Sequence, residues 1–328
     1  MVRAAIVGLG MWGQKLVDSV QGNSDQITFV AGNTRTRSKA EDFCRDRKID
    51  LRDDLGAVLG DPEIDAVVFA TPHRQHEEHI RLAAQAGKHV YVEKPFTLDI
   101  DGARSAIDAV KKAGVVLGVD YQRRFHPSIC EIRDRINDGR LGTISCCVAE
   151  ITTPSGFALK QEHWRINPEE TPVGALTGLG VHLMDGFIDL CGEVDEVYCV
   201  NTRRAAPLVD DTTLFTMKHK SGVVSTAICS LATAVSYCVA VFGSKGIAET
   251  TRPSLDTFRF IPAPGSGSEP ETIDNAGFDP IRAGLEAFAE AISNGTPFPM
   301  TADQIVHDVA VFEAIVQSAK TGLPAKVG

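Results

Sequence analysis

The first half of the chain alternates short apolar runs with segments whose apolar residues recur at helical spacing. Helical patterns begin directly after residue 13 and extend over about 75–86 and 100–113. The apolar runs of strand length occupy residues 2–7, 27–32, 64–70, 89–92 and 115–119. Strands that alternate with helices are typical of a parallel sheet covered by helices on both faces. We therefore predict an α/β, doubly wound Rossmann domain over residues 1–120.

The pattern changes after residue 120, where the regular alternation ends. Helices are predicted at about 127–138, 175–191, 280–293 and 302–321. Strand-like runs lie at residues 143–152, 196–202, 212–218, 223–230 and 237–242. Strands in series without helices between them indicate antiparallel pairing. Residues 121–328 are thus predicted to form a second, α+β domain with a mainly antiparallel open sheet, in which residues 262–280 form a surface loop.

Three glycines at the spacing G-x-G-x-x-G follow the first apolar run, in the sequence Gly8-Leu9-Gly10-Met11-Trp12-Gly13. Gly8 allows a sharp turn out of the strand, Gly10 lets a pyrophosphate approach the backbone, and Gly13 lets the next helix lie close to the strand. The N-terminus of that helix offers N–H groups and a positive dipole end to phosphates. We interpret these six residues as part of a dinucleotide site.

The end of the second predicted strand bears on the choice of cofactor. An acidic residue there would bind the ribose 2′-hydroxyl of NAD and repel the 2′-phosphate of NADP. This chain has Asn33, Thr34 and Arg35 instead, with Arg37 close behind. The prediction is NADP or NAD, with NADP favoured. The alternative is that the two arginines are simply solvated residues at the start of a helix.

Lys94 stands out because it follows directly after the strand predicted at residues 89–92. Ligands of doubly wound sheets bind outside the carboxyl ends of the strands. Lys94 is therefore expected to face the nicotinamide end of the cofactor, where an ammonium can hydrogen-bond a substrate hydroxyl and ease the loss of its proton. His73, His76 and His79 are spaced by three, but no Cys or carboxylate set completes a metal site, and no metal is expected.

Composition excludes several other classes of protein. The formal net charge of −10 and the pI of about 5.4 argue against a nucleic-acid surface. No apolar run approaches the length of a membrane span, and no secretory signal is visible. The eight cysteines are scattered and contain no C-x-x-C pair, which predicts reduced thiols in a cytoplasmic protein.

Four motifs occur in order along the chain: the glycine motif, Ala70-Thr71-Pro72-x-x-x-His76, Ala86-Gly87-Lys88-His89-Val90-x-x-Glu93-Lys94-Pro95 and Tyr121-x-Arg123-Arg124-Phe125-x-Pro127. In this combination the chain resembles the glucose–fructose oxidoreductase / inositol dehydrogenase / MocA family of NAD(P)-dependent oxidoreductases. The resemblance covers essentially the whole chain. It implies cofactor contacts from Thr71, Pro72, His76, Glu93 and Lys94. It also implies a homo-oligomer, a dimer or tetramer, formed through one face of the second domain's sheet.

The resemblance also implies a second catalytic residue, His182, which would take the substrate proton. Members of the family typically carry an Asp four residues before this His, and on a helix that spacing puts both residues on one face. Here Gly178 occupies that position. Asp185 would then either orient His182 or satisfy local backbone groups.

Tyr121, Arg124, Trp164, Arg165 and Asp185 are candidate substrate contacts, and His163 adjoins them. An arginine can bind a carboxylate or phosphate bidentately, and a tryptophan can stack on a ring. Ordinary packing between domains is the alternative interpretation of these residues.

The resemblance implies hydride transfer between nicotinamide and a secondary alcohol or ketone of a sugar, cyclitol or related polyol. Two enzymatic alternatives remain: a dihydrodiol dehydrogenase, and a glycosidase that uses tightly held NAD. A third is a non-catalytic regulator that senses the cofactor, which the missing Asp at Gly178 favours and the presence of Lys94 and His182 opposes.

Overall fold

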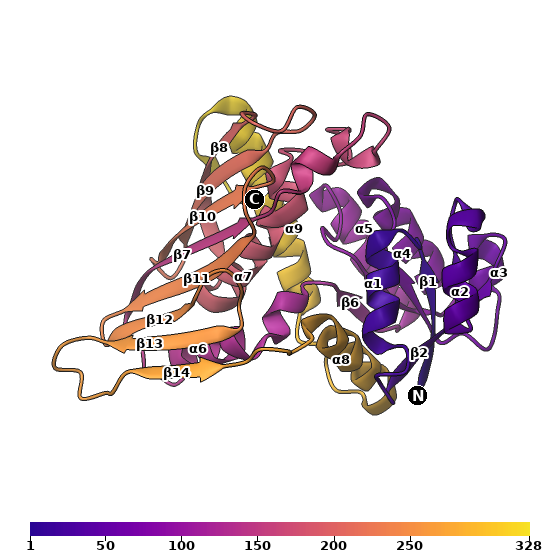
Figure 1. The fold of residues 1–328 in the computed structure, drawn as a ribbon, viewed down its shortest axis with the longest axis horizontal. Helices are drawn as coiled ribbons and strands as arrows, with labels where there is room; N and C mark the ends of the chain where they lie inside the picture. The colour runs from indigo at the N-terminus through magenta and orange to yellow at the C-terminus, as the bar shows by residue number, and fades with distance from the viewer. The chain divides into compact units, whose positions relative to one another are not determined.

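The computed structural model describes residues 1–328, which divide into two compact units (Figure 1). Unit 1 comprises Met1–Gln122 and Asp279–Val309, and unit 2 comprises Arg123–Phe278 and Ala310–Gly328. The first boundary lies within two residues of the one expected from sequence. The second segment of unit 1 differs from the expectation, which assigned every residue after 120 to the second domain.

Unit 1 is built on a six-stranded parallel sheet of order β3-β2-β1-β4-β5-β6. Its strands are β1 Val2–Val7, β2 Ile27–Asn33, β3 Asp50–Leu51, β4 Ala66–Phe69, β5 His89–Val92 and β6 Leu117–Val119. The order reverses between β1 and β4, and in such sheets the carboxyl ends of these strands form the ligand site. The predicted doubly wound Rossmann sheet is confirmed.

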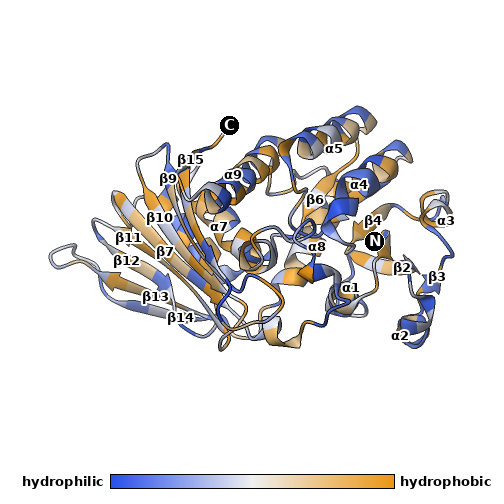
Figure 2. Cartoon of the chain, turned by 90° about the horizontal axis from the view of Figure 1, so that it is seen from above, coloured by the Kyte–Doolittle hydropathy of each residue, from blue (hydrophilic) through white to orange (hydrophobic).

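Helices cover both faces of this sheet, with α4 and α5 together on one side and α1 and α8 on the other (Figure 2). They are α1 Met11–Val20, α2 Glu41–Arg47, α3 Leu55–Leu59, α4 His76–Gln85, α5 Ile100–Ala113 and α8 Pro280–Asn294. Helix α8 joins unit 1 because Leu285 and Phe288 are buried in its core, where the Phe288 ring lies 5.3 Å from that of Tyr91. A parallel sheet needs cover on both faces, and α8 supplies part of it from far along the chain.

Local sequence explains where the longer helices begin and end. The Asp99 carboxylate caps α5 by accepting from the Gly102 N–H, and Gly114 ends the helix with a φ of +68°. Helix α8 begins in the same way, with Asp279 accepting from two backbone N–H groups and Pro280 in the first turn. Acidic N-caps and left-handed glycines at the C-terminus are the standard signals for helix ends.

Unit 2 contains a nine-stranded sheet of order β14-β13-β12-β11-β7-β10-β9-β8-β15. The strands are β7 Ile144–Thr152, β8 Val194–Thr202, β9 Thr212–His219, β10 Val224–Ser230, β11 Ser236–Gly243, β12 Gly246–Thr250, β13 Thr257–Pro262, β14 Glu271–Asp274 and β15 Ala325–Lys326. Only β7 and β10 pair in parallel, so the predicted mainly antiparallel sheet is confirmed.

The loop predicted over residues 262–280 contains strand β14. Its residues Glu271–Asp274 are largely exposed, so the strand shows no apolar alternation that a sequence pattern could reveal. The helices of unit 2 are α6 Pro127–Asn137 and α7 Val181–Cys191, and the division between the units falls within α9 Ala302–Thr321. No helix in the molecule is both long and apolar enough to cross a membrane.

Candidate functional site

The glycine motif of unit 1 forms an open cradle after β1. Gly8 has a φ of +100°, and a Cβ on it would lie 2.5 Å from the Ala70 carbonyl oxygen. A Cβ on Gly13 would lie 2.0 Å from the Gly8 carbonyl oxygen, so only glycine lets α1 approach so closely. Gly10 has no heavy atom within 4 Å of the added Cβ, and no side chain caps the N-terminus of α1. These features fit a dinucleotide pyrophosphate, because backbone N–H groups can be reached at an open helix N-terminus.

The other residues of this motif face different surroundings. Met11 is 81% exposed, whereas Leu9 is buried and would contact a Cβ on Gly32. Trp12 points its indole N–H to the Glu93 carboxylate, with an Asp120 oxygen 3.4 Å away. Asp120, which follows β6, was not singled out by sequence reasoning.

The end of β2 carries a cation and lacks an acid. The Asn33 side chain donates to the Arg52 carbonyl oxygen, at 3.1 Å. Arg37 is held 3.0 Å from the Asp53 carboxylate, whereas Arg35 is exposed and makes no ion pair. Of the two arginines, Arg35 is therefore the one whose guanidinium is available to a phosphate.

His76 connects two segments that sequence analysis assigned to the cofactor site. Its ring is fully buried, with Nδ1 2.9 Å from the Pro95 carbonyl oxygen and Nε2 3.1 Å from that of Thr71. Burial lowers the pKa of His76. Both ring nitrogens therefore contact main-chain carbonyl oxygens of the protein itself. His79 contacts the Thr71 hydroxyl through Nδ1, at 3.1 Å.

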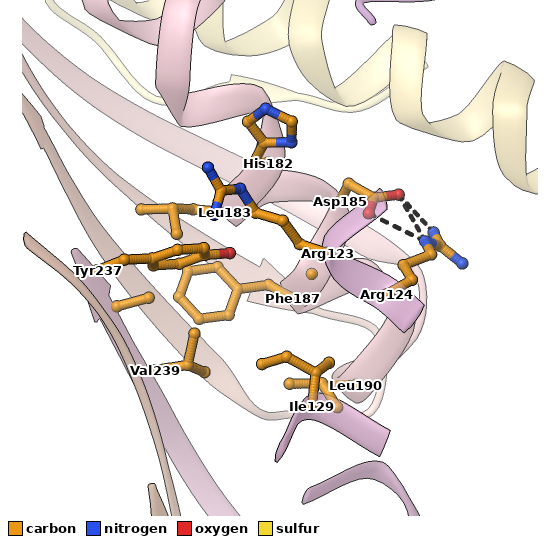
Figure 3. Close-up of a pocket in the computed structure, with 12 residues that line it drawn as sticks. Arg123, Arg124, Ile129, His182, Leu183, Asp185, Phe187, Leu190, Tyr237 and Val239 are labelled. Atoms are coloured by element: carbon orange, nitrogen blue, oxygen red, sulfur yellow. Dashed lines mark hydrogen bonds and ion pairs between the residues drawn. The ribbon is translucent and has the colours of Figure 1, made fainter. Parts of the chain in front are cut away.

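Unit 2 has a small pocket beside α7 (Figure 3). His182 and Tyr237 line it, and the Arg123 guanidinium lies 4.2 Å from the centre of the Tyr237 ring. Burial raises the pKa of Tyr237 to about 12, so its hydroxyl stays protonated at neutral pH. The lining of the pocket thus combines a histidine, a phenol and a guanidinium with apolar side chains.

Arg124 and Asp185 bind each other. Arg124 Nε lies 2.8 and 2.9 Å from the two Asp185 carboxylate oxygens, and its terminal nitrogen lies 2.6 Å from one of them. Both side chains are buried (Figure 3). Asp189 accepts a further hydrogen bond from Arg124, at 3.1 Å. The structure thus gives the Asp185 carboxylate a partner, Arg124, that was not among those expected from the sequence.

Gly178 lies in a π-helical turn, Leu176–Gly180, that leads directly into α7. Single π-helical turns often occur at functional sites. A Cβ on Gly178 would make an ordinary 3.6 Å contact with Leu231, so the backbone leaves room for a side chain. Gly180 differs, because its Cβ would lie 2.8 Å from the Cys229 sulfur.

The remaining substrate candidates are divided between a surface turn and the interior. The Arg165 guanidinium lies 4.3 Å from the centre of the Trp164 ring. The His163 ring also stacks on the Trp164 ring, with the two centroids 6.0 Å apart. All three are half-buried, whereas Tyr121 is buried. No three His, Cys, Asp or Glu side chains lie together in a way that could hold a metal ion.

A parallel sheet of this order with a glycine cradle at its switch point defines a dinucleotide-binding protein. Residues 2–121 match the model of the oxidoreductase family with an NAD-binding Rossmann fold, and residues 129–249 match the GFO/IDH/MocA C-terminal domain. The chain belongs to this family of NAD(P)-binding oxidoreductases, and the resemblance inferred from the motifs is confirmed.

Individual relatives extend the comparison. The chain is 37% identical to scyllo-inositol 2-dehydrogenase (NAD(+)) of Bacillus subtilis (strain 168) over 43% of its own length and 42% of that protein. It is 25% identical to D-xylose 1-dehydrogenase (NADP(+)) 2 of Haloferax volcanii, over 96% of this chain and 95% of the relative. The solved structure of levoglucosan dehydrogenase in complex with NADH and L-sorbose has the same fold, with a TM-score of 0.89 at 20% identity, covering 100% of this chain and 99% of the other.

Proposed function

We propose that the protein transfers a hydride between nicotinamide and a secondary alcohol or ketone of a sugar, cyclitol or related polyol. The observation that carries the proposal is the open glycine cradle at the switch point, with Lys94 two residues beyond the end of β5, the strand next to β4. The names of the inositol and xylose dehydrogenases among its relatives support the substrate class.

The bound cofactor would supply the hydride acceptor or donor, and the chain's own residues would manage the substrate proton. Lys94, at the carboxyl end of a strand, would hydrogen-bond the substrate hydroxyl and favour its loss of a proton. His182, in the pocket beside α7, would accept that proton. Trp164 and Arg165 would contact the substrate.

We propose NADP as the preferred cofactor. The support is the exposed Arg35 guanidinium after β2, together with the lack of an acidic residue at that position. A carboxylate there would repel the 2′-phosphate, whereas a guanidinium forms charge-assisted hydrogen bonds to it.

A substrate screen tests the function directly. Inositols, sugars, glycosides and dihydrodiols are incubated with NAD or NADP, and reduced cofactor is followed by its absorbance. The proposal expects turnover of at least one polyol or sugar, and turnover that falls on the order of 10²–10⁴-fold in Lys94→Ala. Turnover confined to dihydrodiols supports the first alternative. Glycoside cleavage without net cofactor reduction supports the glycosidase. Cofactor binding without turnover of any compound supports the regulator.

We also propose a cytoplasmic homo-oligomer, a dimer or tetramer, that forms through the open face of the unit 2 sheet. The free thiols of all eight cysteines support a reducing compartment. Val200 on β8, Leu214 on β9 and Ile228 on β10 are register partners and form an exposed apolar row across this face. A second copy of the same face is the occupant expected, because such self-complementary patches form two-fold interfaces.

Light scattering after size-exclusion chromatography measures the mass of the assembly. Ile228→Arg is expected to lower this mass, to that of the monomer where the wild type is a dimer, because the charge would be buried in the interface. Val235→Arg is the matched control, since Val235 is 61% exposed and lies outside the strands. A monomeric wild type, or an unchanged mass in Ile228→Arg, would contradict this assignment.

A further inference from the structure

Lys94 lies between two residues that side chains from other segments hold in place. On one side, the indole N–H of Trp12 donates to the Glu93 carboxylate. On the other side, the His76 ring lies 2.9 Å from the Pro95 carbonyl oxygen. Trp12 comes from the glycine cradle and His76 from the first residue of α4. The backbone that carries Lys94 is therefore tied to both neighbouring segments of the proposed cofactor site.

Of the two contacts that the His76 ring makes, the one with Pro95 involves the residue directly after Lys94. A neutral imidazole has one N–H, so one of the two facing carbonyl groups can accept a hydrogen bond at a time. The Pro95 contact is the shorter, at 2.9 Å against 3.1 Å for Thr71. The ring is neutral at neutral pH because burial and the Lys94 ammonium both lower its pKa. The His73 ring packs edge-on against the His76 ring, with the two centroids 5.7 Å apart.

On the Glu93 side of Lys94, Trp12 lies near more than one carboxylate. A second acceptor, Asp120, lies 3.4 Å from the indole nitrogen and follows β6. The Tyr91 hydroxyl donates to Asp120 at 2.9 Å from within β5. Lys15 Nζ lies 4.8 Å from the centre of the Trp12 ring. Trp12 thereby connects the glycine cradle to the ends of two strands.

We propose that Trp12 and His76 are positioning residues that hold the Glu93–Lys94–Pro95 backbone from both sides and so fix the direction of the Lys94 ammonium. This inference rests on the proposed function, in which Lys94 handles the hydroxyl proton. It gives both residues a role different from the cofactor contacts expected from sequence. A displacement of about 1 Å at a reacting group can reduce turnover on the order of 100-fold, so the loss of either contact is expected to lower kcat.

Two amide substitutions separate the contacts of His76. The amide nitrogen of His76→Asn lies near the position of Nδ1 and can donate to Pro95, whereas that of His76→Gln lies near Nε2 and can donate to Thr71. We expect kcat to be at least about tenfold higher in His76→Asn than in His76→Gln, with the KM for the cofactor similar in the two variants. Equal kcat values would overturn the assignment, as would a difference confined to the cofactor KM.

A second measurement needs no turnover. An amine-reactive acetylating reagent is applied to the protein without cofactor, and mass spectrometry follows the rates at Lys94 and at the exposed control Lys39. His76→Gln and Trp12→Phe, which keeps an aromatic ring but loses the donor, should change the rate and its pH profile at Lys94 only. Unchanged labelling of Lys94 in both variants would overturn the proposal, whatever their melting temperatures.

The variant Lys94→Ala separates this inference from the proposed function. If Lys94→Ala retains full turnover, the proposed role of Lys94 fails first. If Lys94→Ala loses turnover while His76→Gln and Trp12→Phe keep both wild-type kcat and wild-type labelling, only the positioning roles fail. Should His76→Gln not fold, Trp12→Phe carries the same test, with unchanged kcat and labelling as the contradicting result.

Discussion

Replacement of Arg124 by methionine is expected to destabilise the protein, and substrate affinity is not expected to be the main loss. The guanidinium donates three hydrogen bonds to the buried Asp185 carboxylate and one to Asp189. Methionine keeps much of the side-chain volume but removes the charge. Removing one partner of a buried ion pair costs about 3–5 kcal/mol, because the remaining charge loses its compensation in a region that excludes water. Arg133 still pairs with Asp189, at 3.0 Å, so most of the loss should arise at Asp185.

Urea unfolding followed by circular dichroism measures this effect. The free energy of unfolding should fall by about 3–5 kcal/mol in Arg124→Met. The double variant with Asp185→Leu should recover about 2 kcal/mol or more, because it also removes the buried carboxylate that Arg124 neutralises. Arg165→Met is the matched control, since its guanidinium stacks on the half-buried Trp164, and it should change stability by less than about 1 kcal/mol. Unchanged stability of Arg124→Met together with a raised KM for substrate would refute the argument and restore Arg124 as a substrate contact.

Three further outcomes are expected. Arg35→Asp should lower the affinity for NADP about tenfold or more relative to NAD, measured by calorimetric titration, and an unchanged ratio would contradict the role of Arg35. Burial lowers the pKa of His79 to about 4 from its ordinary 6.5, so the neutral form is favoured in the folded state. The contribution of His79 to the free energy of unfolding should therefore fall by up to about 3 kcal/mol as the pH drops from 6.5 towards 4, so His79→Gln should lose less stability than the wild type between the two ends of this range in urea titrations. Gly178→Asp, which has room at its Cβ, should raise the pKa of His182 and move the acidic limb of the rate profile for alcohol oxidation to higher pH. A profile that stays in place would show that the two side chains do not interact.

The fold could be predicted largely from the sequence because its signals are local. Alternating strands and helices, a glycine motif and a lysine after a strand each depend on residues close together in the chain. The exceptions have physical causes. Helix α8 belongs to unit 1 because Phe288 packs on Tyr91, a residue far earlier in the chain. Strand β14 is exposed, so no alternation of burial marks it. The π-helical turn before α7 replaces the regular helix that was assumed to carry residue 178.

The partners of individual site residues could not be predicted, and the reason is the same in each case. Trp12 and Glu93 lie 81 positions apart, and Arg124 and Asp185 lie 61 apart, so their pairing depends on packing that no single motif encodes. A motif places a residue near a ligand but does not say whether its side chain faces the ligand or the protein. Burial provides that distinction: Met11 is 81% exposed, whereas His76 is fully buried with its nitrogens on main-chain carbonyl groups. A motif therefore identifies residues near a cofactor site, whereas burial and hydrogen-bond partners are needed to separate side chains that face the protein from those that face outward.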